Sequence, residues 1–68
     1  MNYTKRLRDL RTDSDLTQED IAHILNTTKQ NYGMYENGKR RLSIDDLITL
    51  SKFYKVSTDY ILCLKDEP

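Results

Sequence analysis

The stretch LTQEDIAHILNTTKQNYGMYENG, which covers residues 16–38, constrains the fold of this chain more than any other. Thr17 is a residue type that caps helix N-termini, and acid and amide side chains fill the turn that follows it. Apolar residues then recur with helical spacing over Ile21–Leu25, which indicates one buried face. Asn26 tolerates the left-handed conformation that a helix C-terminus needs, and Asp15, in the turn before the stretch, can adopt it too. The pattern predicts a short helix that ends near Asn26.

A second helix is predicted immediately after this one. Thr28 can cap its N-terminus, and Gly38 can stop it after about Asn37. Two helices that are joined by a turn of about 3–4 residues make a helix-turn-helix. We therefore expect the chain to be organised around such a motif.

The two faces of the second predicted helix differ in chemistry. At about 100° per residue, Tyr32 and Tyr35 share one side and can pack there. The opposite side is mostly polar and contains Lys29, Gln30, Gly33, Met34 and Asn37. In the major groove of DNA, lysine can read guanine O6 and N7, and glutamine or asparagine can read adenine N6 and N7. This face is typical of a recognition helix, although polarity alone fits an ordinary amphipathic helix equally well.

Three segments carry a family resemblance, namely LTQEDIA at residues 16–22, YENGKR at 35–40 and VSTDYIL at 56–62. Together, at this spacing, they resemble the Cro/cI-type (XRE family) helix-turn-helix regulators of bacteria and phages, and the match extends over about Lys5 to Leu62. The resemblance implies an all-α, compact five-helix lambda-repressor-like domain with the helix-turn-helix at its second and third helices. It also implies binding to operator DNA, usually as a homodimer, and we expect the major groove of double-stranded DNA as the partner and a cytoplasmic location.

The resemblance implies roles for individual residues. Lys29 and Gln30 are expected to reach base edges, together with Gly33 and Met34, although polar readers are usual at these last two positions. We expect Gly33 to let the helix approach the DNA closely, with Met34 against a thymine methyl group; drift at an unused position is the alternative. The expected phosphate contacts are Gln18, Thr28, Asn37, Lys39, Arg40 and Arg41. A solvated charge run is the alternative for the last three.

Arg11 and Glu36 are the expected structural pair. In the family, an arginine that matches Arg11 pairs with a glutamate that matches Glu36, and the pair ties the first helix to the recognition helix. The alternative is two exposed charges, which would contribute little. The chain departs from the family pattern at Asn26 and Cys63, where glycine is common, and at Leu42, where proline is common.

The net charge is zero, which at first argues against a nucleic-acid partner. The charges are segregated along the chain, however: residues 1–11 and 28–43 are basic, whereas residues 12–27 and 44–68 are acidic. The recognition segment and the arm at the start of the chain are therefore modestly basic. Such a face implies a modest non-specific affinity for the DNA backbone.

Three further helices are predicted, one over about Tyr3 to Asp13 and two that begin at Ser43 and Ser57. The fourth helix carries a broad apolar stripe from Ile44 to Tyr54. The fifth carries more apolar surface than a short terminal helix can bury, which favours a homodimer interface; the alternative is that these residues close the core. The interface candidates are Tyr60, Leu64 and Phe53. The polar tail, residues 65–68, is expected to fray.

Length and composition set further bounds. The 68 residues suit one domain with its core at about residues 5–62, without a membrane span or a signal-peptide core. The single cysteine fits a reducing compartment. One histidine and one cysteine are too few for the usual zinc sites. We therefore expect no metal, no cofactor, no small-molecule ligand and no enzymatic activity.

Two classes of function remain. The first is a sequence-specific DNA-binding regulator, most simply a repressor that binds a near-palindromic operator as a dimer. The second is a protein-interaction module of helix-turn-helix shape, such as an antitoxin-like or regulator-binding partner whose DNA role is secondary. The polar outer face of the second predicted helix and the basic loop after it favour the first class.

Overall fold

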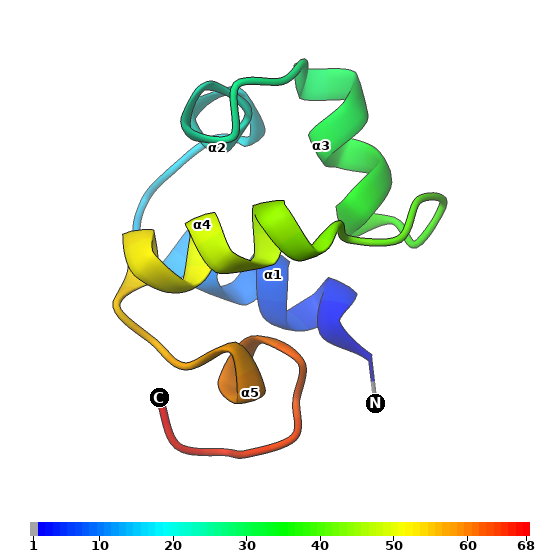
Figure 1. Cartoon of the computed structure of the whole chain (residues 1–68). Helices are drawn as coiled ribbons and strands as arrows, with labels where there is room; N and C mark the ends of the chain where they lie inside the picture. The colour runs from blue at the N-terminus through cyan, green and yellow to red at the C-terminus, as the bar shows by residue number, and fades with distance from the viewer. Residues whose placement is uncertain (1) are drawn as a thin grey trace.

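Short polar side chains begin the five helices that the structure contains over residues 2–68, the part of the chain that it describes. In this computed structural model the helices are α1 (Tyr3–Asp13), α2 (Gln18–Ile24), α3 (Lys29–Glu36), α4 (Ile44–Tyr54) and α5 (Thr58–Ile61) (Figure 1). Each is preceded by a residue whose side chain accepts a hydrogen bond from the first turn, and these residues are Asn2, Thr17, Thr28, Ser43 and Ser57. The predicted all-α, five-helix architecture is confirmed, since residues 2–68 contain no strand.

The start of α2 is held by a reciprocal pair of hydrogen bonds. The hydroxyl of Thr17 accepts from the backbone N–H of Asp20 at 3.1 Å, and the carboxylate of Asp20 accepts from the N–H of Thr17 at 2.9 Å. The bond that the Thr17 N–H donates to the Asp20 carboxylate is the main cause of a lowered pKa at Asp20. This capping box sets where α2 begins and therefore where Gln18, its first residue, lies.

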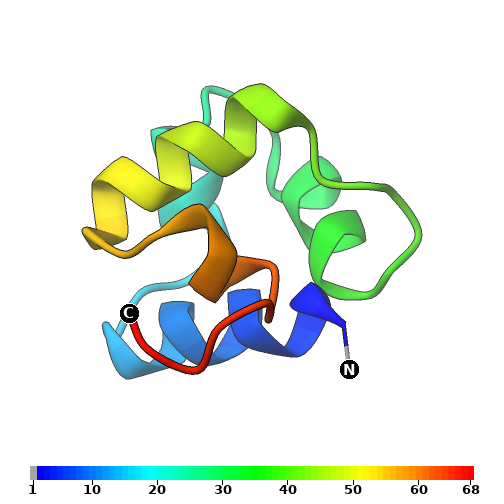
Figure 2. The ribbon, with the colours of Figure 1, turned by 60° about the horizontal axis from the view of Figure 1, so that its bottom comes forward.

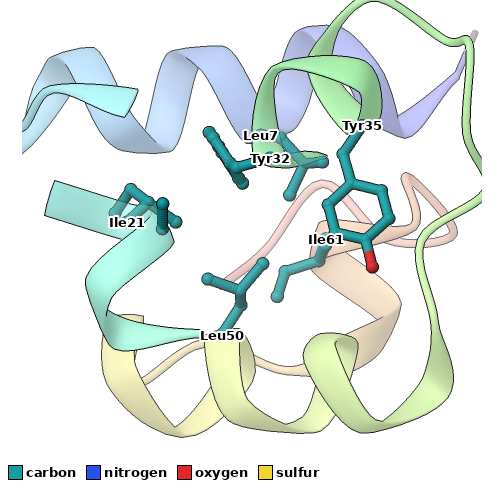
Figure 3. Packing of buried hydrophobic residues seen from close by; sticks show 7 residues of the cluster. Leu7, Ile21, Tyr32, Tyr35, Leu50 and Ile61 are labelled. Carbon is teal, nitrogen blue, oxygen red and sulfur yellow. The ribbon is translucent and has the colours of Figure 1, made fainter. Parts of the chain in front are cut away.

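The core lies where the five helices converge, and each helix contributes at least one fully buried large side chain (Figure 3). These residues are Leu7, Ile21, Tyr32, Leu50 and Ile61. The ring of Tyr35 joins them and meets the ring of Tyr32 edge to face, with 6.3 Å between the centroids. Each large apolar side chain that is buried in this way contributes roughly 1.5–3 kcal/mol relative to full exposure. A core of this kind holds α3 by its tyrosine face and leaves its other face at the surface.

Four residues other than glycine adopt the left-handed conformation in turns that follow helices. Asp15 and Asn26 have φ values of 57° and 56°, as expected from the sequence. Lys55 and Cys63 have φ values of 58° and 63°, after α4 and α5, and neither residue type favours this conformation. Cys63 thus ends the last helix in the conformation for which glycine is best suited.

The C-terminal half has two features that the sequence analysis did not foresee. Part of the apolar stripe of α4 stays at the surface, because Ile44 and Ile48 lie one turn apart on its outer side and are 75% and 43% exposed. The tail is not frayed, because the backbone N–H of Ser57 donates to the carbonyl oxygen of Pro68 at 3.0 Å. Figures 1 and 2 show the tail turning back past α5 toward the end of α4.

Candidate nucleic-acid interface

Helices α2 and α3 form the predicted helix-turn-helix, and α3 lies at the edge of the molecule (Figure 1). The tyrosine face of α3 is buried, as its side chains Tyr32 and Tyr35 are at most 2% exposed. The hydroxyl of Tyr35 donates to the carboxylate of Asp46 at 2.6 Å, which ties α3 to α4. Burial raises the pKa of Tyr32, so that its phenol stays neutral inside the core. The helix is thereby fixed in rotation about its own axis.

The outer face of α3 presents the residues that the sequence placed there. Lys29 and Gln30 are exposed, and Gly33 and Met34 are half-buried. Thr28 is exposed, and its hydroxyl accepts from the N–H of Asn31 at 3.1 Å, so it still has a proton to donate. Of the four predicted base-reading residues, Lys29 and Gln30 are thus the most open, whereas the side chain of Gln18 from α2 lies beside Gly33.

A basic loop follows α3. Gly38 has φ of +78°, and the backbone N–H groups of Lys39 and Arg40 both donate to the carbonyl oxygen of Met34. The side chain of Asn37 accepts from the N–H of Lys39 at 3.2 Å. The side chains of Lys39, Arg40 and Arg41 are all exposed. The backbone of the loop thus folds back against the end of α3, and its three basic side chains lie at the surface.

Arg11 and Glu36 form a two-pronged ion pair between α1 and α3. The Nε atom of Arg11 lies 2.7 Å from Oε2 of Glu36, and its Nη2 lies 3.1 Å from Oε1. The two side chains are 15% and 3% exposed. The Nη1 atom of Arg11 also donates to the carbonyl oxygen of Leu16 at 3.0 Å, so the same arginine holds the turn before α2.

Gln18 makes a contact that sequence reasoning missed. Its Nε2 atom donates to Oε1 of Glu36 at 3.2 Å, and its side chain crosses α3 next to Gly33. A glutamine at the start of α2 gave no signal of a partner eighteen positions away, because that contact depends on how α2 and α3 pack. Glu36 therefore joins three helices through Arg11 and Gln18.

The ionisation of Glu36 follows from these contacts. Burial by itself would raise the pKa of this carboxyl, but the hydrogen bonds that it accepts, that from Arg11 foremost, and the charge of Arg11 together outweigh burial and hold the pKa below its ordinary range. The hydrogen bond with Glu36 likewise raises the pKa of Arg11. The pair is consequently charged at neutral pH and contributes to stability as an ion pair.

The three predicted interface residues near the C-terminus have different surroundings. Leu64 is 71% exposed and Phe53 is 40% exposed. Tyr60 is half-buried, because the guanidinium of Arg6 lies over its ring at 3.9 Å from the centroid and donates to its carbonyl oxygen at 2.8 Å. The sequence analysis did not foresee this contact, and it occupies much of the Tyr60 ring within the chain. Leu64 and Phe53 are the apolar side chains of the three that stay free at the surface.

Residues 2–68 contain no cluster of three or more metal-ligating side chains. None of the helices described combines the length and apolar character that crossing a membrane requires. Cys63 is a half-buried free thiol.

Comparisons with known proteins agree on the motif. The HTH_3 helix-turn-helix family model matches residues 7–61. The uncharacterized HTH-type transcriptional regulator YobD of Bacillus subtilis (strain 168) is 42% identical over 66 residues, which cover 97% of this chain and 59% of YobD. The HTH-type transcriptional regulator ImmR of the same organism is 42% identical over 67 residues, which cover 98% of this chain and 52% of ImmR. The chain thus spans little more than half the length of these relatives.

A solved structure gives the same fold. The crystal structure of the P22 c2 repressor protein in complex with a synthetic operator superposes with a TM-score of 0.82 at 21% identity, over 91% of this chain and 94% of that one. At this identity the likeness concerns the fold.

Proposed function

This chain belongs to the Cro/cI-type (XRE) helix-turn-helix family, and we propose that it is a sequence-specific double-stranded DNA-binding transcriptional regulator. The observation that carries the proposal is the outer face of α3, where Lys29 and Gln30 are exposed in the first turn and an exposed basic loop follows the last turn. A helix held by a buried tyrosine face can enter the major groove with its polar side chains toward the bases. The printed names of YobD and ImmR, which are transcriptional regulators, support the same function.

Base reading falls to Lys29 and Gln30 in this proposal, with Met34 against a thymine methyl group. The exposed side chains of Lys29 and Gln30 lie in the first turn of α3, the end that contacts base edges when a recognition helix enters the groove. Gly33 lies on the same face, between them and the basic loop. Phosphate contacts fall to the surrounding donors, which are Gln18, Thr28, Asn37, Lys39, Arg40 and Arg41. Such contacts set the orientation on DNA, whereas base contacts set the sequence.

Repression is the simplest mode of action, because occupying a promoter blocks it without any further contact. A single helix-turn-helix reads few base pairs, so we propose a homodimer on a near-palindromic operator whose half-sites lie about 34 Å apart. The exposed side chains of Leu64 and Phe53 support an interface at the C-terminal end. A cytoplasmic location in a bacterium accords with the organism of the relatives named above.

Selection of bound DNA from a random duplex pool tests the function directly. We expect the wild-type chain to enrich a near-palindromic sequence. Gln30→Ala should then lose about 1–3 kcal/mol of discrimination at one base pair of each half-site. Lys39→Ala should weaken binding to all sequences and reduce the salt slope by about one.

The matched control is Lys52→Ala, which removes an exposed lysine from the last turn of α4. It should leave both affinity and salt slope unchanged. Equal, sequence-independent losses in Gln30→Ala and Lys39→Ala would remove Gln30 from the readers. Failure to enrich any DNA would favour the protein-interaction module.

Assembly is tested by sedimentation and by the number of chains per operator. Leu64→Glu should reduce the dimer on DNA and weaken operator binding, because it charges an interface that is otherwise apolar. Ile44→Glu is the control, since Ile44 is equally exposed but lies at the start of α4. If Leu64→Glu still binds as two chains with unchanged affinity, the interface lies elsewhere.

A further inference from the structure

The carboxamide of Gln18 lies between α2 and α3 and contacts two residues of the recognition helix. Its Nε2 atom lies 3.2 Å from Oε1 of Glu36. Its Oε1 atom lies 3.4 Å from the position that a Cβ atom would have at Gly33. Gln18 is half-buried, so part of its side chain remains accessible at the surface beside α3. One side chain of α2 is thus held against the outer face of α3.

Chemistry fixes the orientation of this carboxamide. An ionised carboxylate only accepts hydrogen bonds, so the NH₂ group of Gln18 must be the end that faces Glu36. Arg11 holds the carboxylate from the opposite side through two bonds of 2.7 and 3.1 Å. The NH₂ group has a second proton, which points away from the one that is bonded to Glu36. That proton is the donor that Gln18 can offer to DNA.

The position of the Gln18 carboxamide also depends on the space that is left at position 33. The nearest atoms to a Cβ at Gly33 are all from Gln18, at 3.4, 3.8 and 3.9 Å. A methyl group would therefore meet the carboxamide at ordinary contact distance, without displacing it. A longer side chain would extend into the volume that the carboxamide occupies and would push it off α3.

We propose that Gly33 and Glu36 are positioning residues that act on DNA through Gln18, Glu36 by orienting its NH₂ group and Gly33 by leaving room for its carboxamide. The inference rests on the proposed function and specifies how α3 controls a contact made from α2. It differs from the expectation that Gly33 serves direct close approach of α3 to DNA. In that mechanism the DNA itself meets any added atom, and Gln18 is irrelevant to the effect.

The two mechanisms predict different operator affinities for Gly33→Ala, and they predict different results for a double-mutant cycle between positions 18 and 33. Operator affinity is measured for Gly33→Ala and Gly33→Gln, each with Gln18 intact and each combined with Gln18→Ala. If Gly33 acts through Gln18, Gly33→Ala binds within about twofold of wild type, whereas Gly33→Gln binds about tenfold more weakly. In the Gln18→Ala background, Gly33→Gln should change affinity by less than about twofold, because the group that it displaces is already gone.

Nuclear magnetic resonance of the free protein gives a second readout. The side-chain amide signals of Gln18 are assigned by their loss in Gln18→Ala. One of the two protons should carry the downfield shift and slow exchange of a hydrogen bond to a carboxylate. Gly33→Ala should keep this signature, and Gly33→Gln should abolish it while the melting temperature shows a folded domain.

Different results would contradict this inference and the proposed function. Equal losses for Gly33→Gln in both backgrounds, or a tenfold loss for Gly33→Ala, would overturn this inference and restore direct close approach. An unchanged Gln18 signature in Gly33→Gln would also overturn it. A chain that enriches no DNA in the selection would overturn the proposed function, and this inference with it.

Discussion

Helix α1 takes part in three ion pairs, and two of them have equal length in different surroundings. Lys5 and Asp9 lie one turn apart on its outer face, with 2.7 Å between Nζ and Oδ2 and with side chains that are 75% and 47% exposed. Arg11 reaches Glu36 on α3 at the same 2.7 Å, with side chains that are 15% and 3% exposed. The two pairs therefore have the same length, but they differ in burial, and only the second pair joins two helices. An ion pair of the same length can therefore contribute little to stability on one side of a helix and much on the other.

The reason lies in what happens when one partner is removed. At the exposed pair, water replaces the lost partner and the remaining charge stays solvated. At the buried pair, the remaining charge is left in a site from which water is largely excluded. Glu36 also receives the amide of Gln18, and Arg11 holds the carbonyl oxygen of Leu16. Loss of the buried pair would consequently loosen both the recognition helix and the turn before α2.

The largest expected effect is that of Glu36→Ala, which should lower the free energy of unfolding by about 3–5 kcal/mol because it strands a buried guanidinium. Urea denaturation followed by circular dichroism measures the change. The matched control is the double variant Arg11→Met/Glu36→Leu, which removes both charges and should lose much less. A cost below about 1 kcal/mol for Glu36→Ala would show that the buried pair behaves as an exposed one.

The contribution of the Arg11–Glu36 pair to stability should also be measurable in the wild-type chain, by lowering the pH. The pKa of Glu36 lies below its ordinary 4.5, since the hydrogen bonds that it accepts outweigh the effect of burial. Because the carboxyl binds its proton more weakly in the folded than in the unfolded state, its stabilisation is complete above about pH 4.5 and is lost as the pH falls through the folded pKa. The free energy of unfolding, measured from pH 7 downward, should decline in that window.

Two variants identify the source of the acid sensitivity. Arg11→Met/Glu36→Leu should show a shallower decline, since it lacks the carboxyl. Asp20→Asn removes an exposed carboxyl whose pKa is also lowered, by the hydrogen bonds from Thr17, and should leave the Glu36 contribution in place. An identical acid profile for wild type and for the Arg11/Glu36 double variant would assign the sensitivity to other groups.

The smallest expected effect is at the exposed pair. A double-mutant cycle of Lys5→Ala and Asp9→Ala should give a coupling free energy of about 0.5 kcal/mol or less. The order of the two residues, with the base before the acid, opposes the helix dipole and reduces the value further. The coupling should vanish at about 1 M salt, where the screening length is roughly 3 Å. A coupling free energy above about 1 kcal/mol that persisted at high salt would contradict the claim that the exposed pair contributes little to stability.

The helix starts were predictable because their causes are local. The hydroxyls of Thr17, Thr28, Ser43 and Ser57 each accept from an N–H three residues on, so the sequence around each position contains both partners. The rotation of α3 was predictable for a similar reason, since two tyrosines at helical spacing define its buried face. The predicted outer face follows from that rotation.

The Arg11–Glu36 ion pair was predictable only through the family resemblance. Nothing in the spacing of Arg11 and Glu36 shows that they meet, because 25 positions separate them and their contact depends on the packing of α1 against α3. Family likeness supplied this pair but did not supply the amide of Gln18 between Glu36 and Gly33. The same holds for the contact between Arg6 and the ring of Tyr60, since 54 positions separate these two residues.

The sequence by itself determined where helices begin, where Asn26 turns the chain and which side of α3 is polar, because these depend on hydrogen bonds and periodicity within a few residues. Only the tertiary structure decided that Ile44 remains exposed while Leu50 is buried, and that the tail returns to Ser57. Burial and distant partners are properties of how helices meet. Apolar residues at neighbouring positions of α4 have similar local signals, and their surroundings in the folded chain differ completely.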